Sequence, residues 1–195
     1  IVVGPRAANG VFEETAFLHP DLGFFVKFPE KWLHENAPQQ IVAVAPDKNA
    51  AVVLKAVAKG DDPLEGARVL GKARKVDLAA KAKSLTINGL PAAQAVIPAE
   101  GKAQIELTWI AHGGLIFQLA AVASTGQLKT FQPAFDAVAG SFRPLTGHER
   151  ARITEKRVRL ITARKGETIE ALAARAHSAW KADEVAVVNG LATAT

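Results

Sequence analysis

The chain has 195 residues, of which 49% are apolar and 22% are charged, a balance typical of a folded globular protein and not of a disordered one. Its 24 Lys and Arg residues against 19 Asp and Glu residues give a net charge of +5, too small to indicate nucleic-acid binding by charge alone. Cysteine is absent, which excludes disulfides and thiolate chemistry, and no run approaches the ~20 apolar residues of a membrane span.

The N-terminal part of the chain alternates between apolar runs and turns. Residues 1–16 contain glycine and proline and are predicted to be a linker with a short strand near Val11. Large apolar residues recur at every second position over residues 24–28, which is the period of a β-strand. Two further apolar runs, at residues 41–45 and 51–57, flank a turn-rich segment and are predicted to form a hairpin.

A helix is predicted to begin at Asp62, whose carboxylate can cap it, with Pro63 in the first helical position, and to run to about Ala73. The basic residues of this segment have few acidic neighbours. They are either a solvated helix face or a surface for an acidic partner or a phosphate group. This basic patch consists of Arg68, Lys72, Arg74 and Lys75.

The following segment has the pattern of an antiparallel meander. Asn88-Gly89 lies between two apolar runs, and Asn-Gly is a strong hairpin sequence. Gly113-Gly114 separates two longer runs and is predicted to form the next turn. A stripe of apolar residues at helical spacing then covers residues 131–138 and predicts a second helix.

These elements indicate an α+β domain over residues 17–144, with an antiparallel sheet of about seven strands and two packed helices. The helices are segregated in sequence from the runs of strands, which is typical of an α+β domain. Residues 145–156 carry alternating charges and are predicted to be a linker or a short exposed helix. Residues 157–195 have an apolar pattern of their own and are predicted to be a separate module.

The module at residues 157–195 begins with an apolar run at residues 158–161, which is predicted to be a strand. Gly166 can adopt the positive φ of a tight turn, and Thr168 can cap the helix that follows. Leu172 lies in the apolar stripe of that helix and is expected to be buried against the strand. Ser178 is predicted to cap a second short helix, which ends at residues 189–190.

This order of strand, helix, helix and Asn-Gly-Leu stop resembles the LysM module. The resemblance is carried by residues 164–169, 172–173 and 188–191; the closing strand of a LysM module has no counterpart before the chain ends. It implies a shallow groove for N-acetylglucosamine polymers, although the same residues can serve only as turns and caps. The residues at the groove positions are Gly166, Glu167, Thr168, Ile169, Asn189, Gly190 and Leu191.

The larger domain resembles PsbP-like domains in residues 23–32 and 135–143, which implies an antiparallel sheet with packed helices. Together with residues 18–24 and the LysM-like module, the chain is similar to the C-terminal region of bacterial zinc metallopeptidases. These peptidases are relatives of the CAAX prenyl protease and of the β-barrel-assembly-enhancing protease. The resemblance implies export to the periplasm and a zinc-binding HExxH domain upstream of this segment.

The segment itself has no recognisable catalytic motif. A zinc peptidase helix needs two histidines four residues apart, but the five histidines of this chain are never closer than 15 positions. No serine lies in a Gly-x-Ser-x-Gly sequence, and Gly113-Gly114 lacks the spacing of a phosphate-binding loop. We therefore expect no enzyme activity, no metal and no cofactor in residues 1–195.

Two functions follow as hypotheses. The first is a non-catalytic accessory region of an exported zinc metallopeptidase, which positions a substrate or partner near the cell envelope. The second is a peptidoglycan-binding module. The expected partners are an envelope protein or the peptidase domain of the same chain, with peptidoglycan as the alternative and with neither nucleic acid nor a membrane span in this segment.

Overall fold

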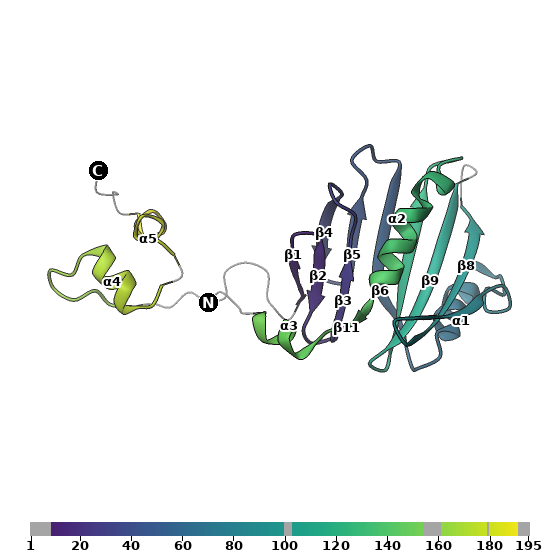
Figure 1. Cartoon of the computed structure of the whole chain (residues 1–195), viewed down its shortest axis with the longest axis horizontal. Helices are drawn as coiled ribbons and strands as arrows, with labels where there is room; N and C mark the ends of the chain where they lie inside the picture. Colours follow the sequence, from purple (N-terminus) through teal and green to yellow (C-terminus); the bar gives the residue numbers. More distant parts are fainter. Residues whose placement is uncertain (1–8, 100–102, 154–160, 179, 191–195) are drawn as a thin grey trace. The chain divides into compact units, whose positions relative to one another are not determined.

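The computed structural model describes residues 9–99, 103–153, 161–178 and 180–190 (Figure 1). The chain divides into two compact units, residues 2–156 and residues 157–195. Within the described residues, no helix has both the length and the apolar character that a membrane crossing requires.

A seven-stranded antiparallel sheet forms the centre of the larger unit, in the order β4-β5-β6-β10-β9-β8-β7. The predicted hairpin turn at Asn88-Gly89 is confirmed, because both residues have positive φ and join two paired strands. The strands are β4 (Leu33–Ala37), β5 (Gln40–Val44), β6 (Ala50–Lys59), β7 (Lys83–Ile87), β8 (Leu90–Pro98), β9 (Gln104–His112) and β10 (Leu115–Ala123).

A second, four-stranded sheet has the order β1-β2-β3-β11, and it was not predicted. Its strands are β1 (Val11–Glu13), β2 (Ala16–His19), β3 (Phe24–Lys27) and β11 (Arg143–Pro144). The short strand predicted near Val11 is confirmed as β1, which pairs with β2 and so makes residues 11–13 part of this sheet. Phe12 explains the pairing, since its ring lies 5.0 Å from the ring of Phe17 and 6.0 Å from that of Phe28.

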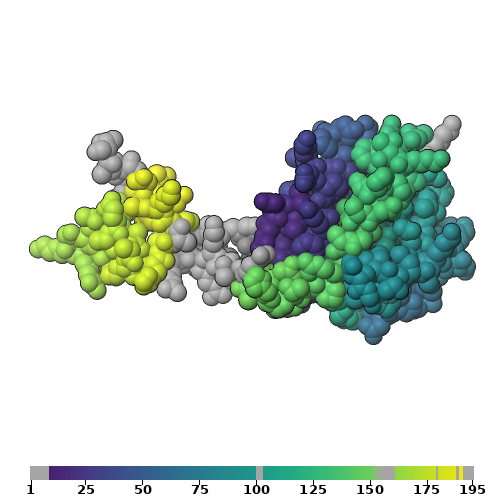
Figure 2. All heavy atoms as spheres, in the orientation of Figure 1, coloured from purple at the N-terminus to yellow at the C-terminus, as the bar shows by residue number. Residues whose placement is uncertain are grey.

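Two helices cover opposite faces of the seven-stranded sheet. The residues of α2 (Leu128–Ser141) pack with Phe117 and Leu119 of β10, whereas α1 (Leu64–Arg74) packs with Ile116, which points the other way. Figure 1 shows α2 along the front of the sheet, and Figure 2 shows its surface beside that of the N-terminal strands. The α+β prediction with two packed helices is confirmed.

Residues 145–152 continue the folded unit. A capping box of Thr146 and Glu149 begins the short helix α3 (Gly147–Arg152), the second of the two structures predicted for residues 145–156. The Arg143 guanidinium also binds Glu149, with 2.6 Å between Nη2 and Oε1, and this contact holds the pKa of the Glu149 carboxyl at about 2. The helix is thereby attached to β11.

The smaller unit contains two short helices, α4 (Ile169–Arg175) and α5 (Ala182–Val188), close to the predicted positions. The predicted strand at residues 158–161 lies outside the described residues except for Ile161, which is exposed. Leu172 is half-buried and not buried as expected. Ser178 accepts a hydrogen bond from the Trp180 amide, but α5 begins later, after Lys181, so Ser178 is not its cap.

Candidate functional site

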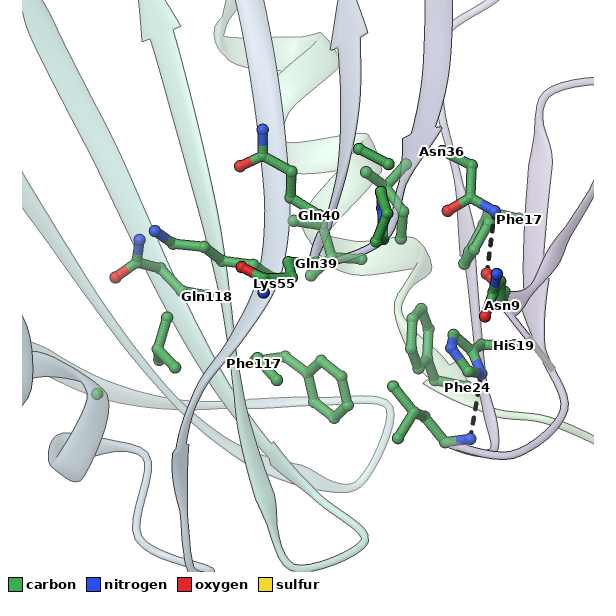
Figure 3. A pocket seen from close by; sticks show the side chains of 18 of the residues that line it. Asn9, Phe17, His19, Phe24, Asn36, Gln39, Gln40, Lys55, Phe117 and Gln118 are labelled. Carbon is green, nitrogen blue, oxygen red and sulfur yellow. Dashed lines mark hydrogen bonds between the residues drawn. The ribbon is translucent and has the colours of Figure 1, made fainter.

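A cavity of about 640 Å³ lies in the larger unit where the two sheets meet α1 (Figure 3). One wall comes from the four-stranded sheet, a second from α1, and a third from the turn between β4 and β5. Strands β6 and β10 contribute the remaining lining. A volume of this size is within the range of about 300–1,000 Å³ typical of ligand sites in proteins.

The cavity exists because neighbouring strands differ in length. β6 has ten residues but β5 has only five, and β5 pairs with residues 51–54 of β6 alone. The chain turns back at residues 37–40, so the second half of β6 has no strand on this side. A β-bulge in the β6–β10 ladder falls at the same level, next to Phe117.

Aromatic rings form an apolar floor. Phe24 lies between Phe17 and Phe117, with ring centroids 6.0 Å and 4.9 Å away, and all three rings are buried. Leu54 of β6 completes this floor and is 1% exposed. A floor of this kind favours an apolar group of a ligand, because each aromatic ring removes a large area from water.

Amide side chains surround the floor. Gln118 is buried and accepts a hydrogen bond from Trp109 Nε1 at 3.0 Å, which fixes the direction of its oxygen. Its Nε2 has no partner among the described residues and remains available as a donor.

The other amide side chains lie nearer the rim. Asn36 donates to the carbonyl oxygens of Asn9 and Gly10 and so connects β4 to the start of the domain. Gln39 and Gln40 are exposed at the rim.

His19 lines the cavity at the end of β2. Its Nδ1 accepts the Leu22 amide at 3.2 Å, and its ring lies 5.5 Å from that of Phe24. Burial lowers the pKa of the imidazole, and the nearby Asp21 carboxylate opposes this only in part. The ring is therefore neutral at pH 7, and because Nδ1 accepts, the proton is at Nε2. The side chain offers a donor and not a positive charge.

The lining is mainly apolar and carries little charge. Lys55 is the only charged residue of the lining among the described residues, and no carboxylate or serine hydroxyl faces it. No group of three or more His, Cys, Asp or Glu side chains in the described part of the chain is placed to hold a metal ion. The zinc that the peptidase resemblance implies has no fitting ligand set in this part of the chain.

A separate polar cluster lies beneath α2. Glu106 of β9 is only 5% exposed, and its Oε2 accepts from Gln132 Nε2 at 2.6 Å, while the same nitrogen donates to Asp136 at 3.0 Å. Burial raises the pKa of the Glu106 carboxyl, and the Asp136 charge raises it further. These residues do not line the cavity, and no pattern in the sequence connects them.

The predicted basic patch is partly assembled. Arg68, Lys72 and Lys75 border a shallow hollow of about 330 Å³ beside the end of α1, but Arg74 does not. Arg68 is engaged by Asp62 at 2.9 Å and by Glu65, and Asp77 borders the same hollow. These three carboxylates compensate much of the positive charge, as expected for a solvated helix face.

The predicted sugar-binding residues at the start of α4 have structural roles. Gly166 has a φ of +77°, and Thr168 caps α4 by accepting from the Ala171 amide at 3.3 Å. Both Glu167 oxygens bind Arg175, at 2.6 Å and 2.8 Å, and one also accepts from the Arg164 amide. Ile169 is half-buried.

At the end of α5, Asn189 is the C-cap and Gly190 has a φ of +66°, so the predicted left-handed stop is confirmed at Gly190. The Asn189 side chain donates to the Val185 carbonyl at 2.8 Å, within its own helix. Leu191 lies outside the described residues.

The ion pair of Glu167 gives a testable pH dependence. The Arg175 guanidinium holds the pKa of Glu167 at about 2, so the pair stabilises this unit above pH 4.5, and the contribution is lost as the pH falls towards 2. Arg175→Ala is expected to return the pKa of Glu167 towards its usual value, as measured by NMR titration of the carboxyl carbon. Glu149, whose pKa is held at about 2 by Arg143, is the internal control and should not move. A Glu167 pKa that stays near 2 in the variant would contradict the observed pairing.

Comparison with known proteins shows the fold alone. No known family and no curated protein matches the sequence. A crystal structure from Bacteroides thetaiotaomicron is 15% identical with a TM-score of 0.50; the match covers 71% of this chain and 51% of that one, so this chain spans about half of its length. Cyanobacterial PsbP (CyanoP) from Synechocystis is 10% identical with a TM-score of 0.50, over 69% of this chain and 95% of that one.

A third structure, LpqN of Mycobacterium tuberculosis, which is involved in cell envelope biogenesis, is 20% identical over 69% of this chain and 91% of that one, with a TM-score of 0.43. Identities this low carry no function from these proteins to this chain. The predicted architecture, in contrast, is confirmed, and the larger unit has a PsbP-like α+β fold.

Proposed function

We propose that this chain is a non-catalytic accessory region of an exported zinc metallopeptidase and that it positions a substrate or partner through the cavity between the two sheets. The observation that carries the proposal is the cavity itself. It combines a buried aromatic floor with amide and imidazole donors, and its lining in the described residues has no carboxylate, no serine hydroxyl and no group of three or more metal-binding side chains.

The peptidase assignment rests on the order of the two modules in the sequence, and it supplies the remaining parts of the proposal. The zinc and the catalytic residues belong to an upstream domain of the same polypeptide, and the site of action is the periplasm or cell envelope. The partners are then the peptidase domain itself or an envelope protein.

The first test examines the amino-acid sequence of the polypeptide in which these residues occur. The proposal expects an HExxH sequence upstream in the same reading frame, and it expects the isolated residues 1–195 to hold substoichiometric zinc after dialysis at neutral pH. A reading frame without HExxH would remove the peptidase assignment, and one tightly bound zinc ion per isolated chain would show a metal site in this region.

The second test addresses the cavity in the intact peptidase. Ala56 is exposed on β6 and lines the cavity, so Ala56→Trp should fill it without disturbing the core. We expect a several-fold higher KM for a protein substrate with an unchanged kcat for a short peptide that reaches only the catalytic domain. Val96→Trp, at a 50% exposed position of β8 outside the cavity, is the matched control. Equal effects of the two variants would contradict a role of the cavity.

The sugar-binding alternative has less support. Three of the residues at the groove positions are used inside their own unit, Glu167 by Arg175, Thr168 as a cap and Asn189 by the Val185 carbonyl. If residues 157–195 nevertheless bind N-acetylglucosamine polymers, the chain should sediment with purified peptidoglycan, and Arg175→Ala should weaken this by releasing the Glu167 turn.

A further inference from the structure

Strand β6 has an unpaired edge inside the folded unit. β10 pairs with it along nearly its whole length, whereas β5 stops at Leu54, so residues 55–59 have no partner strand on that side among the described residues. The Ala50 carbonyl accepts the Ala45 amide, which shows that the even-numbered residues in this part of β6 point their main-chain groups towards β5. Ala56 is the next such residue after Leu54, and it lines the cavity.

The open edge of β6 lines the cavity. Phe117 of β10 is the cross-strand partner of Ala56 of β6. Its ring forms part of the aromatic floor together with Phe24. The α1 wall presents Val69, an apolar residue that is 50% exposed. The unused donors of the lining, at Gln118 Nε2 and His19 Nε2, lie around the same space.

We propose that the cavity receives an extended peptide segment, which adds as a strand to the open edge of β6 and places an apolar side chain on the aromatic floor. This rests on the proposed function and names the class of substrate or partner that the cavity takes. A peptide is favoured over a compact small molecule because the open edge belongs to an extended strand, whose main-chain donor and acceptor are matched by those of another extended backbone. The bulge beside Phe117 changes the alternation after Ala56, since the Gly60 amide donates to Gly114 on the β10 side, so the pairing is centred on Ala56.

The chemistry of the lining also restricts the peptide. Because Lys55 is the one charged residue of the described lining, a neutral or acidic segment is accepted and a cationic one is disfavoured. When a peptide adds as a strand, its main-chain hydrogen bonds supply the affinity. Every second side chain of the peptide then points to the aromatic floor, so aromatic or branched residues are preferred at those positions.

The test uses a tethered peptide, which makes weak binding measurable. The chain has no cysteine, so Gln39→Cys, at an exposed position of the rim, gives a single attachment point. The probe is the synthetic peptide Cys-Gly-Thr-Phe-Thr-Val-Thr-amide, joined to the protein through a disulfide. We expect the hydrogen exchange of the Ala56 amide to become about tenfold slower, and the NMR signals of Phe117 to shift.

Two controls separate strand addition from other binding. The same peptide with N-methyl groups on all five residues after its glycine keeps every side chain but cannot bring either edge of its main chain against β6, and it should leave the Ala56 amide unprotected. The original peptide attached at Lys129→Cys, on an exposed position of α2, should do the same.

Three outcomes overturn the inference in distinguishable ways. If the methylated and unmethylated peptides protect Ala56 equally, strand addition is wrong, although the cavity remains a binding site. If Phe117 shifts while Ala56 stays unprotected with both peptides, the cavity binds side chains alone. If neither residue responds to any tethered peptide, and Ala56→Trp also leaves KM unchanged, the inference and the proposed function fail together.

Discussion

Replacing Phe24 by alanine is expected to lower the free energy of unfolding of the larger unit by about 3–5 kcal/mol. Phe24 is 1% exposed and joins the two sheets, because its ring contacts Phe117 of β10 at a centroid distance of 4.9 Å. On its other side it stacks on Phe142 at 5.1 Å, just after α2. Truncation leaves a void where the four-stranded sheet is attached to the seven-stranded one, and it enlarges the cavity.

The neighbouring Phe25→Ala is the matched control for this experiment. Phe25 is half-buried on the opposite face of β3, where the Arg143 guanidinium lies 3.9 Å from its ring centroid. Its loss is expected to cost about 1 kcal/mol, from partial burial and one cation–π contact. Denaturant unfolding followed by tryptophan fluorescence measures both variants. Similar costs for the two would show that Phe24 is not the connection between the sheets.

Gly66→Ala is expected to destabilise the larger unit by about 1–3 kcal/mol, although alanine is the better helix former. A Cβ at position 66 would lie 2.3 Å from Cδ1 of Trp109, whose ring is fully buried and hydrogen-bonded to Gln118. The ring has no free space into which to move, so α1 must shift away from the sheet. This shift would also open the α1 wall of the cavity, which Gly66 lines.

Gly140 gives the corresponding control in α2. Nothing lies within 4 Å of a Cβ built at this position, so Gly140→Ala should be neutral or stabilising by up to about 1 kcal/mol. The melting temperatures of the two variants give the comparison. If Gly66→Ala is as well tolerated as Gly140→Ala, then α1 does not sit against Trp109 as described.

Little of the candidate site was predictable from the sequence. Phe17 and Phe24 are ordinary strand residues by pattern, and nothing local indicates that their rings face Phe117, about a hundred positions later along the chain. His19 stands alone in the sequence before Pro20, and its place beside the cavity follows only from the pairing of β2 with β3. The residues with a predicted binding role were instead those with conspicuous turn chemistry, such as Gly166 and Thr168, which the structure uses for a turn and a cap.

The sequence by itself determined the elements whose geometry is local. Asn88-Gly89 closes a hairpin because both residues tolerate positive φ, and the Asp62 carboxylate accepts the Leu64 amide at 3.0 Å where α1 starts. The tertiary structure decided how the strands are grouped and where they end. The polar strand β4 and the sheet of β1, β2, β3 and β11 depend on partners distant in sequence, and β5 is too short to cover β6 only because of the turn at residues 37–40. The cavity is the product of these long-range pairings, and apolar periodicity carries no information about which strands they join.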